Sequence, residues 1–280
     1  METLPLLALR GLVVFPGMLL HFDVGRKKSI LALNEAMGED QTIFLVAQKD
    51  IANDDPDESQ LYNVGVVAKI RQVLKLPGDN LRVLVEGLYR ARLDSLTQSE
   101  PFFVCVSKEC PEIRITNTMR REALVRECRS RFEAYAELAS KMAPEVMLGV
   151  ATAEEPGYLA DYIASNIALP IEEKQVILGT ISVEKRMEKL LVFLERESSV
   201  LEIERDIQEH VHEQIDRNQK EYYLREQMRV ISSELGEADN PLEEADEYRE
   251  KIGKLNLSGE NRAKLLKECD KLSKMPFGSH

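Results

Sequence analysis

Two histidines, His210 and His212, each next to a glutamate, are the residues whose types most directly suggest metal binding. The surrounding stretch has a helical composition, and residues two apart on a helix point about 200° away from each other. The two imidazoles therefore cannot share one ion, and we expect a solvated helix face instead. No CxxC pair is present, so we predict neither zinc sites nor disulfides from the four cysteines, Cys105, Cys110, Cys128 and Cys269.

The sequence lacks the motifs of nucleotide or peptide chemistry. A phosphate-binding loop requires the pattern GxxxxGK[ST], but the one Gly-Lys pair, Gly253-Lys254, is followed by leucine and has no earlier glycine in place. There is also no GxSxG nucleophile motif. We therefore predict no catalytic, cofactor-binding or metal-binding residue in this chain.

Arg225 and Arg229 follow Tyr222 and Tyr223, a combination that can hold phosphates and stack on bases. Glutamates at 221 and 226 interrupt this patch, and the chain carries a net charge of −12. Nucleic acids and anionic membranes normally require a concentrated basic surface. We therefore favour helix packing for this stretch and expect no nucleic-acid or membrane partner.

The strongest binding candidate is apolar. In FPGML at 15–19, the side chains of Phe15, Met18 and Leu19 surround the turn pair Pro16-Gly17, where polar residues are usual. Exposed apolar groups on a turn suit unfolded polypeptide, although the same side chains could fold under the sheet as core. A second set, beside Pro144, has the same two interpretations; it contains Met142, Met147 and Leu148.

The first 110 residues have a β-rich pattern. Residues 13–15 and 19–24 flank the Pro-Gly pair as a bent or hairpin segment, 26–37 is a short helix, and 42–47 is a buried-type strand. Alternating apolar residues from Val64 to Ile70 and from Leu81 to Val85 predict a hairpin with its turn at 77–80. Gly87 indicates a bulge in the return strand, and 101–110 supplies a last strand. We expect a small, curved, mainly antiparallel sheet.

From residue 118 the chain becomes helical. One predicted helix covers 118–142, with Leu124, Cys128 and Phe132 on one face, and prolines then leave short helices near 145–150, 156–168 and 171–180. A very long helix should run from an N-cap at Ser182 to Gly236, unless Ser198-Ser199 divides it into two. Two charged helices follow near 242–253 and 259–273.

The apolar residues of the long helix form two stripes. One contains Ile203, Ile207, Val211, Ile215 and Tyr222, and the other contains Leu224, Met228, Ile231 and Leu235. Because nine residues separate Ile215 from Leu224, the stripes lie on opposite sides of the helix. We predict a connecting helix that changes its packing partner near 222–224, with an interdomain surface formed by Tyr222, Tyr223, Leu224, Arg225 and Met228.

Three segments resemble one family. QKEYYLREQMRVISSELGE is similar to the helix before the ATPase module of bacterial Lon, an ATP-dependent serine protease, and LLALRGLVVFPGMLLHFDVGRKKSILAL and VLVEGLYRARL resemble the Lon amino-terminal domain. The resemblance implies an α+β fold, with a PUA-like β lobe at 1–115 and a helical bundle at 116–200. It also implies a connecting helix at 201–236 and, at 237–280, the start of an AAA+ ATPase module, before the nucleotide site.

The resemblance further implies a substrate-recognition module for unfolded, damaged or tagged proteins. Its partners would be the ATPase and protease domains of a homohexamer that uses ATP and magnesium, and the fragment itself could dimerise. The opposing interpretation is a structural spacer that stabilises the hexamer and touches substrate little. No apolar run is long enough to span a bilayer, and 4–9 lacks the basic lead of a signal peptide, so we expect a cytoplasmic protein.

Overall fold

The computed structural model describes residues 1–78, 80–139, 142–234, 241–255 and 257–273. It divides into two units, Met1–Ile203 and Glu204–His280. The predicted helix end at Gly236, the stripe residue Leu235 and one residue of the 77–80 turn lie outside the described residues.

The first unit begins with a six-stranded sheet. Its strands are β1 (Glu2–Leu9), β2 (Leu19–Val24), β3 (Thr42–Ala47), β4 (Val64–Lys75), β5 (Leu81–Gln98) and β6 (Val104–Glu109). The order is β2-β5-β4-β3-β1-β6, and β6 also pairs with β5. Since β5 and β6 join directly, the five strands other than β2 form a closed ring. Only the β1–β3 pair is parallel, so the predicted mainly antiparallel lobe is confirmed.

The predicted hairpin and bulge are confirmed, and one strand was missed. Val67 pairs with Tyr89 and Ala68 with Gly87, which leaves Leu88 as the extra residue of a bulge in β5. Residues 13–15 form no strand, so the segment is bent rather than a hairpin. β1 was not predicted, because both of its faces are buried: Leu7 and Leu9 belong to one core cluster, and Leu6 and Ala8 to another. A strand buried on both faces has no alternating pattern.

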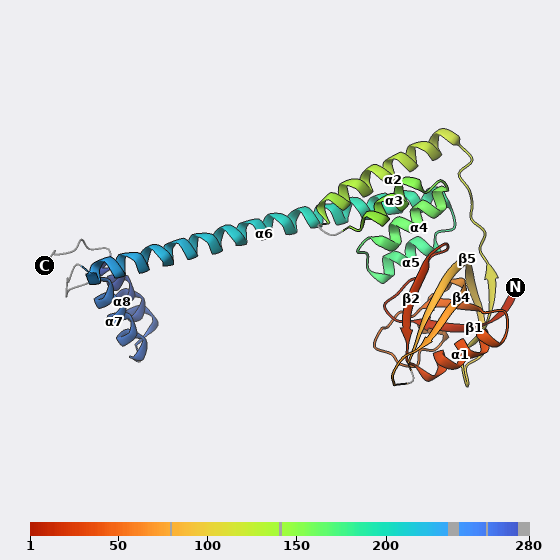
Figure 1. Ribbon diagram of the computed structural model, residues 1–280, viewed down its shortest axis with the longest axis horizontal. Helices are drawn as coiled ribbons and strands as arrows, with labels where there is room; N and C mark the ends of the chain where they lie inside the picture. The colour runs from red at the N-terminus through yellow and green to blue at the C-terminus, as the bar shows by residue number, and fades with distance from the viewer. Residues whose placement is uncertain (79, 140–141, 235–240, 256, 274–280) are drawn as a thin grey trace. The chain divides into compact units, whose positions relative to one another are not determined.

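Helix α1 (Lys27–Gly38) lies beside the sheet, and α2 (Thr118–Leu138), α3 (Pro144–Thr152), α4 (Pro156–Asn166) and α5 (Ile171–Gly179) form a bundle near it (Figure 1). The bundle core includes Leu124, Cys128 and Phe132 of α2, as their spacing predicts. It continues into the sheet core without interruption. Sheet and bundle therefore share one hydrophobic core.

Helix α6 (Val183–Glu234) is continuous through Ser198-Ser199. The Ser182 Oγ accepts a hydrogen bond from the Lys185 backbone N–H at 3.5 Å, which confirms the predicted N-cap. The first turns of α6 bury a face that completes the bundle, formed by Val183, Met187, Leu190 and Leu194. Within the second unit, α7 (Pro241–Lys254) and α8 (Gly259–Leu272) follow.

The second half of α6 has no packing partner among the described residues of this chain, so its predicted change of partner stays a prediction. All described members of both stripes are exposed, including Ile207, Val211 and Met228. The proposed interdomain residues Tyr222, Tyr223, Leu224 and Arg225 are exposed as well, and Arg225 pairs with Glu221 one turn earlier at 2.7 Å. An amphipathic pattern shows that a helix has an apolar face, but it does not show that the same chain covers it.

Candidate functional site

The turn at residues 15–18 lies where the sheet meets the bundle. Gly17 has φ +76°, and the Met18 N–H donates to the Phe15 carbonyl at 3.3 Å, as in a type II turn with proline in second place. The turn is held to the β5 bulge, because the Gly17 N–H donates to the Gly87 carbonyl and the Gly87 N–H to the Met18 carbonyl. A Cβ at Gly87 would lie 2.4 Å from the Phe15 oxygen, so this approach requires glycine.

The candidate residues of this turn separate into core and surface. Phe15 is completely buried in the shared core, so of its two interpretations the structure supports core packing. Met18 is half-buried against the same core. Leu19 remains 62% exposed, and Pro16 lines a cavity between sheet and bundle. Phe15 therefore fixes the turn to the core, whereas Leu19 exposes an apolar side chain to solvent.

Met142 and Met147 are half-buried and pack against the core, while their neighbour Leu148 is exposed. Neither methionine lines the cavity beside Pro16. The structure thus does not bring the two predicted apolar sets together in one site.

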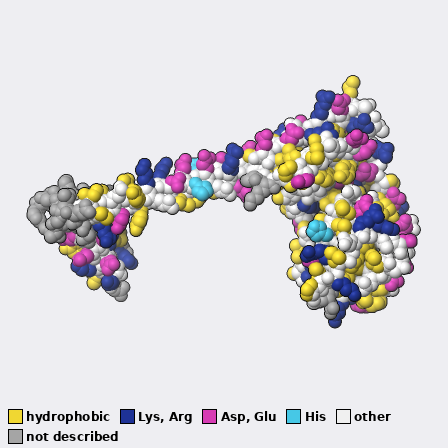
Figure 2. Space-filling view, viewed as in Figure 1, with side chains coloured by type: hydrophobic (Ala, Val, Ile, Leu, Met, Phe, Trp, Pro, Cys, Tyr) yellow, Lys and Arg dark blue, Asp and Glu magenta, His cyan; other side chains and the backbone are white. Residues whose placement is uncertain are grey.

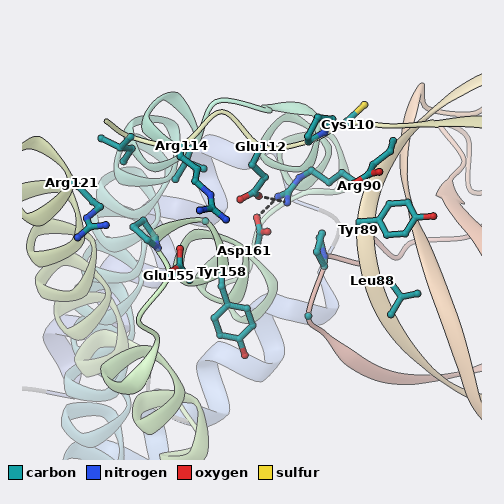
Figure 3. Close-up of a pocket in the computed structure, with 18 residues that line it drawn as sticks. Leu88, Tyr89, Arg90, Cys110, Glu112, Arg114, Arg121, Glu155, Tyr158 and Asp161 are labelled. Carbon is teal, nitrogen blue, oxygen red and sulfur yellow. Dashed lines mark hydrogen bonds and ion pairs between the residues drawn. The ribbon is translucent and has the colours of Figure 1, made fainter. Parts of the chain in front are cut away.

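The cavity beside Pro16 has a volume of about 540 Å³ and lies between the β5 bulge, the 110–115 linker and the start of α4 (Figure 3). One wall is apolar and includes Leu88 and Tyr158, both of which are partly exposed. The Tyr158 ring lies over the turn, since a Cβ at Gly17 would come within 2.8 Å of it. Leu19, which follows the turn in sequence but does not line the cavity, is exposed as well. We call these three side chains the apolar rim (Leu19, Leu88 and Tyr158).

The floor of the cavity is charged. Arg90 of β5 is 2% exposed and donates to Asp161 of α4, to Glu112 of the linker at 2.8 Å, and to the Leu178 carbonyl at 2.9 Å. Arg186 of α6 is completely buried and donates to Glu112 at 2.6 Å and to the Thr180 carbonyl at 3.0 Å. Two guanidiniums and two carboxylates thus tie the sheet, the linker and two helices together.

Burial and charge oppose each other in this cluster. Burial raises the pKa of the Asp161 carboxyl, and the positive charges of Arg90 and Arg186 act in the opposite direction. Glu112, the fourth member, has a side chain that is 35% exposed. Arg90, Asp161 and Arg186 are therefore shielded from solvent, and solvent reaches the cluster at Glu112.

Two residues of this cluster occupy positions that pattern analysis could have singled out. Arg186 lies among the apolar positions of the buried face of α6, next to Met187, and Asp161 lies within the apolar face of α4, next to Ala160. A charged residue at a core position is rarely fully buried unless it is paired. Their partners on β5 and the linker become neighbours only in the folded chain.

The histidines and cysteines singled out in the sequence form no common site among the described residues. His210 and His212 are exposed on α6, and no group of three potential metal ligands is found in the described part of the chain. All four cysteines are buried free thiols. Burial raises the pKa of Cys105 and of Cys128 to about 12, which keeps both thiols neutral.

A comparison with solved structures defines the class of fold. The N-terminal domain of Mycobacterium avium complex Lon protease superposes with a TM-score of 0.58 over 69% of this chain and 98% of that domain, at 22% sequence identity. This likeness shows that the sheet and helical bundle have the architecture of a Lon amino-terminal domain.

Sequence comparison establishes the family. Residues 3–196 match the family described as the ATP-dependent protease La (LON) substrate-binding domain. The chain is 46% identical over 278 residues to Lon protease of Brevibacillus choshinensis, and 45% identical over 275 residues to Lon protease of Syntrophomonas wolfei. This chain therefore belongs to the Lon substrate-binding domain family.

The matches include nearly all of this chain but only part of each relative. They cover 99% and 98% of the chain, and 36% and 34% of the Brevibacillus and Syntrophomonas proteins. The chain thus spans about a third of the length of these relatives. Among the described residues, no helix is both long enough and apolar enough to cross a membrane.

Proposed function

We propose that this chain is the substrate-recognition and assembly module of a Lon-type ATP-dependent protease. It captures unfolded, damaged or tagged proteins and passes them to an ATPase and serine peptidase carried by the remaining two-thirds of such a protein, in a homohexamer that uses ATP and magnesium. In this proposal the module itself performs no catalysis and works in the cytoplasm.

The observation that carries the proposal is the apolar rim beside the cavity. Leu19, Leu88 and Tyr158 are exposed on rigid elements, because the turn, the bulge and α4 hold their backbones in place. Unfolded polypeptide exposes apolar side chains that a folded protein hides, and burying one leucine side chain contributes about 1.5–3 kcal/mol. A rim of this kind favours unfolded over folded protein without requiring a particular sequence.

Binding of a fluorescently labelled, reduced and alkylated protein, which cannot refold, tests the proposal by anisotropy. We expect Leu19→Ser plus Leu88→Ser to weaken binding about tenfold, which corresponds to about 1.4 kcal/mol. The matched control, Leu31→Ser plus Leu74→Ser, removes two exposed leucines elsewhere on the β lobe. Equal loss in both variants, or none in the first, would contradict capture by the rim.

A second candidate function is the structural spacer, and the exposed face of α6 favours it. Ile203, Ile207, Val211 and Ile215 are uncovered in the single chain, and an apolar face of this length is typical of helices that associate. In this alternative the fragment mainly stabilises the hexamer. Sedimentation of the chain at rising concentration tests the spacer, because the spacer requires association through α6.

A further inference from the structure

The carboxylate of Glu112 occupies a position built to hold an anion. It receives hydrogen bonds from Arg90 at 2.8 Å and from Arg186 at 2.6 Å. It also lies against the backbone of Gly157, where a Cβ would come within 2.4 Å of its Oε2 atom. Gly157 belongs to the first turn of α4, where the positive end of the helix dipole favours anions. We call Arg90, Gly157 and Arg186 the carboxylate site.

The carboxylate site is held in place by groups other than Glu112. Arg90 is fixed by the Leu178 carbonyl, and Arg186 by the Thr180 carbonyl; both guanidiniums also contact Asp161. Glu112, in contrast, belongs to the linker between β6 and α2, and its side chain is partly exposed. The two arginines would thus keep their positions if Glu112 moved away, and one positive charge would be left without a counter-charge.

We propose that the carboxylate site binds an acidic side chain of a polypeptide, which takes the place of Glu112. In the free chain Glu112 acts as an internal ligand, and an incoming aspartate or glutamate exchanges with it. This inference rests on the proposed function, and it assigns a chemical preference to the cavity beside the apolar rim: an acidic residue with apolar neighbours.

The cavity suits this exchange. Arg90, Glu112 and Gly157 all line it, so the site opens into a volume of about 540 Å³ that is large enough for several atoms of a second side chain. Figure 3 shows the side chains of Glu112 and Asp161 turned toward Arg90, with dashed lines for the interactions between them. Leu88 and Tyr158 supply apolar contacts for the residues that flank the acid.

The mouth of the cavity is electrically balanced. Arg114 and Arg121 line it, and neither makes an ion pair within the described parts of the chain; Glu109 and Glu155 line it as well. These four charges cancel, so the mouth neither attracts nor repels an acidic segment strongly. The preference for a carboxylate therefore comes from the two buried guanidiniums that hold Glu112, of which that of Arg90 lines the cavity.

A small soluble carboxylate that fills the place of the missing Glu112 side chain tests the site directly. We expect Glu112→Ala to lower the thermal unfolding midpoint by several degrees, and acetate to restore most of this loss at constant ionic strength while chloride does not. Glu109→Ala, which removes another glutamate of the same cavity, is the matched control and should show no acetate effect. Equal effects of acetate and chloride on Glu112→Ala would overturn the carboxylate site.

Peptide binding tests whether the incoming carboxylate belongs to a polypeptide. The variant Glu112→Gln keeps the size of the side chain and removes its charge. Two labelled peptides with amidated ends share the same apolar residues and differ only in a central Glu or Gln. We expect Glu112→Gln to bind the Glu peptide about tenfold more tightly than the wild type does, with no change for the Gln peptide. Equal binding of both peptides by both proteins would overturn this inference and leave the proposed function intact. Failure of every protein to bind either peptide would count against the proposed function itself.

Discussion

Phe15 and Leu19, on either side of the Pro16-Gly17 pair, have opposite environments. Phe15 is completely buried in the core that sheet and bundle share, whereas Leu19 is mostly exposed. The difference follows from backbone geometry, because the positive φ of Gly17 reverses the chain between them. Stability and binding can therefore be changed separately within five residues.

We expect Phe15→Ala to lower the free energy of unfolding by about 3–5 kcal/mol, because it removes a buried ring and leaves a cavity. Leu19→Ala should change it by less than about 0.5 kcal/mol, since an exposed side chain loses few contacts. Urea unfolding followed by circular dichroism measures both. If Leu19→Ala proved as costly as Phe15→Ala, Leu19 would be covered in solution and unable to contact a substrate.

Burial of two cysteines predicts how the stability of the fold changes with pH. The pKa of Cys105 and of Cys128 is about 12 in the folded chain, above the ordinary value of 9.0, because burial penalises the thiolate. The unfolded chain releases these protons first, so this contribution to stability is complete below pH 9 and is lost as the pH rises toward 12.

At pH 8 we therefore expect both thiols to resist a thiol-specific reagent until the protein is unfolded in urea, as followed by mass spectrometry of the labelled peptides. The same reagent with the protein in urea is the control. Rapid labelling of Cys128 in the native protein would show that the bundle core opens readily.

At the level of elements, α6 contains two environments within one helix. Its first turns bury Met187, Leu190 and Leu194 in the bundle, while Ile207 and Val211 are exposed. Figure 2 shows hydrophobic side chains among charged ones along this helix. The ion pairs of α2 with the first part of α6, such as Arg120 with Glu184 at 2.9 Å, are exposed and contribute little beside this burial.

Leu190→Ala should therefore cost about 2–5 kcal/mol of unfolding free energy. Ile207→Ala, the matched change on the same helix, should cost under about 0.5 kcal/mol at low protein concentration. Both values come from urea unfolding. A large cost for Ile207→Ala that grows with concentration would show that a second copy covers this face.

The sequence predicted most elements but not their partners. Helices α2 to α6 were found because local apolar spacing and prolines determine them, and the hairpin was found because its strands alternate. The strand β1 was missed because it is buried on both faces. The cluster of Arg90, Glu112, Asp161 and Arg186 could not be predicted, since its members come from β5, the linker, α4 and α6 and meet only in the folded chain.

At the level of the whole molecule, Met1–Ile203 forms a compact unit with its own core. The core cluster that joins sheet and bundle has its last buried member at Leu194. A chain that ends at Ile203 thus keeps every buried contact of that cluster.

We expect this shortened chain to unfold at the same temperature, within about 2 °C, as the first transition assigned to the unit in the full chain, as measured by calorimetry. Shortening the chain further, after Lys189, removes Leu190 and Leu194 and should abolish cooperative unfolding. A large destabilisation of the chain that ends at Ile203 would mean that later residues support the bundle.

The ring of strands has a consequence for biosynthesis. β1, made first, pairs with β6, made last, from Glu2 opposite Ser107 to Pro5 opposite Val104. The ring cannot close until residue 109 has left the ribosome, so the edge of β1 that pairs with β6 stays open while the rest of the lobe is translated. Contacts between such distant residues form slowly. A domain whose proposed task is to capture unfolded chains would thus itself be an unfolded chain during its first seconds. In that time it would need protection by chaperones.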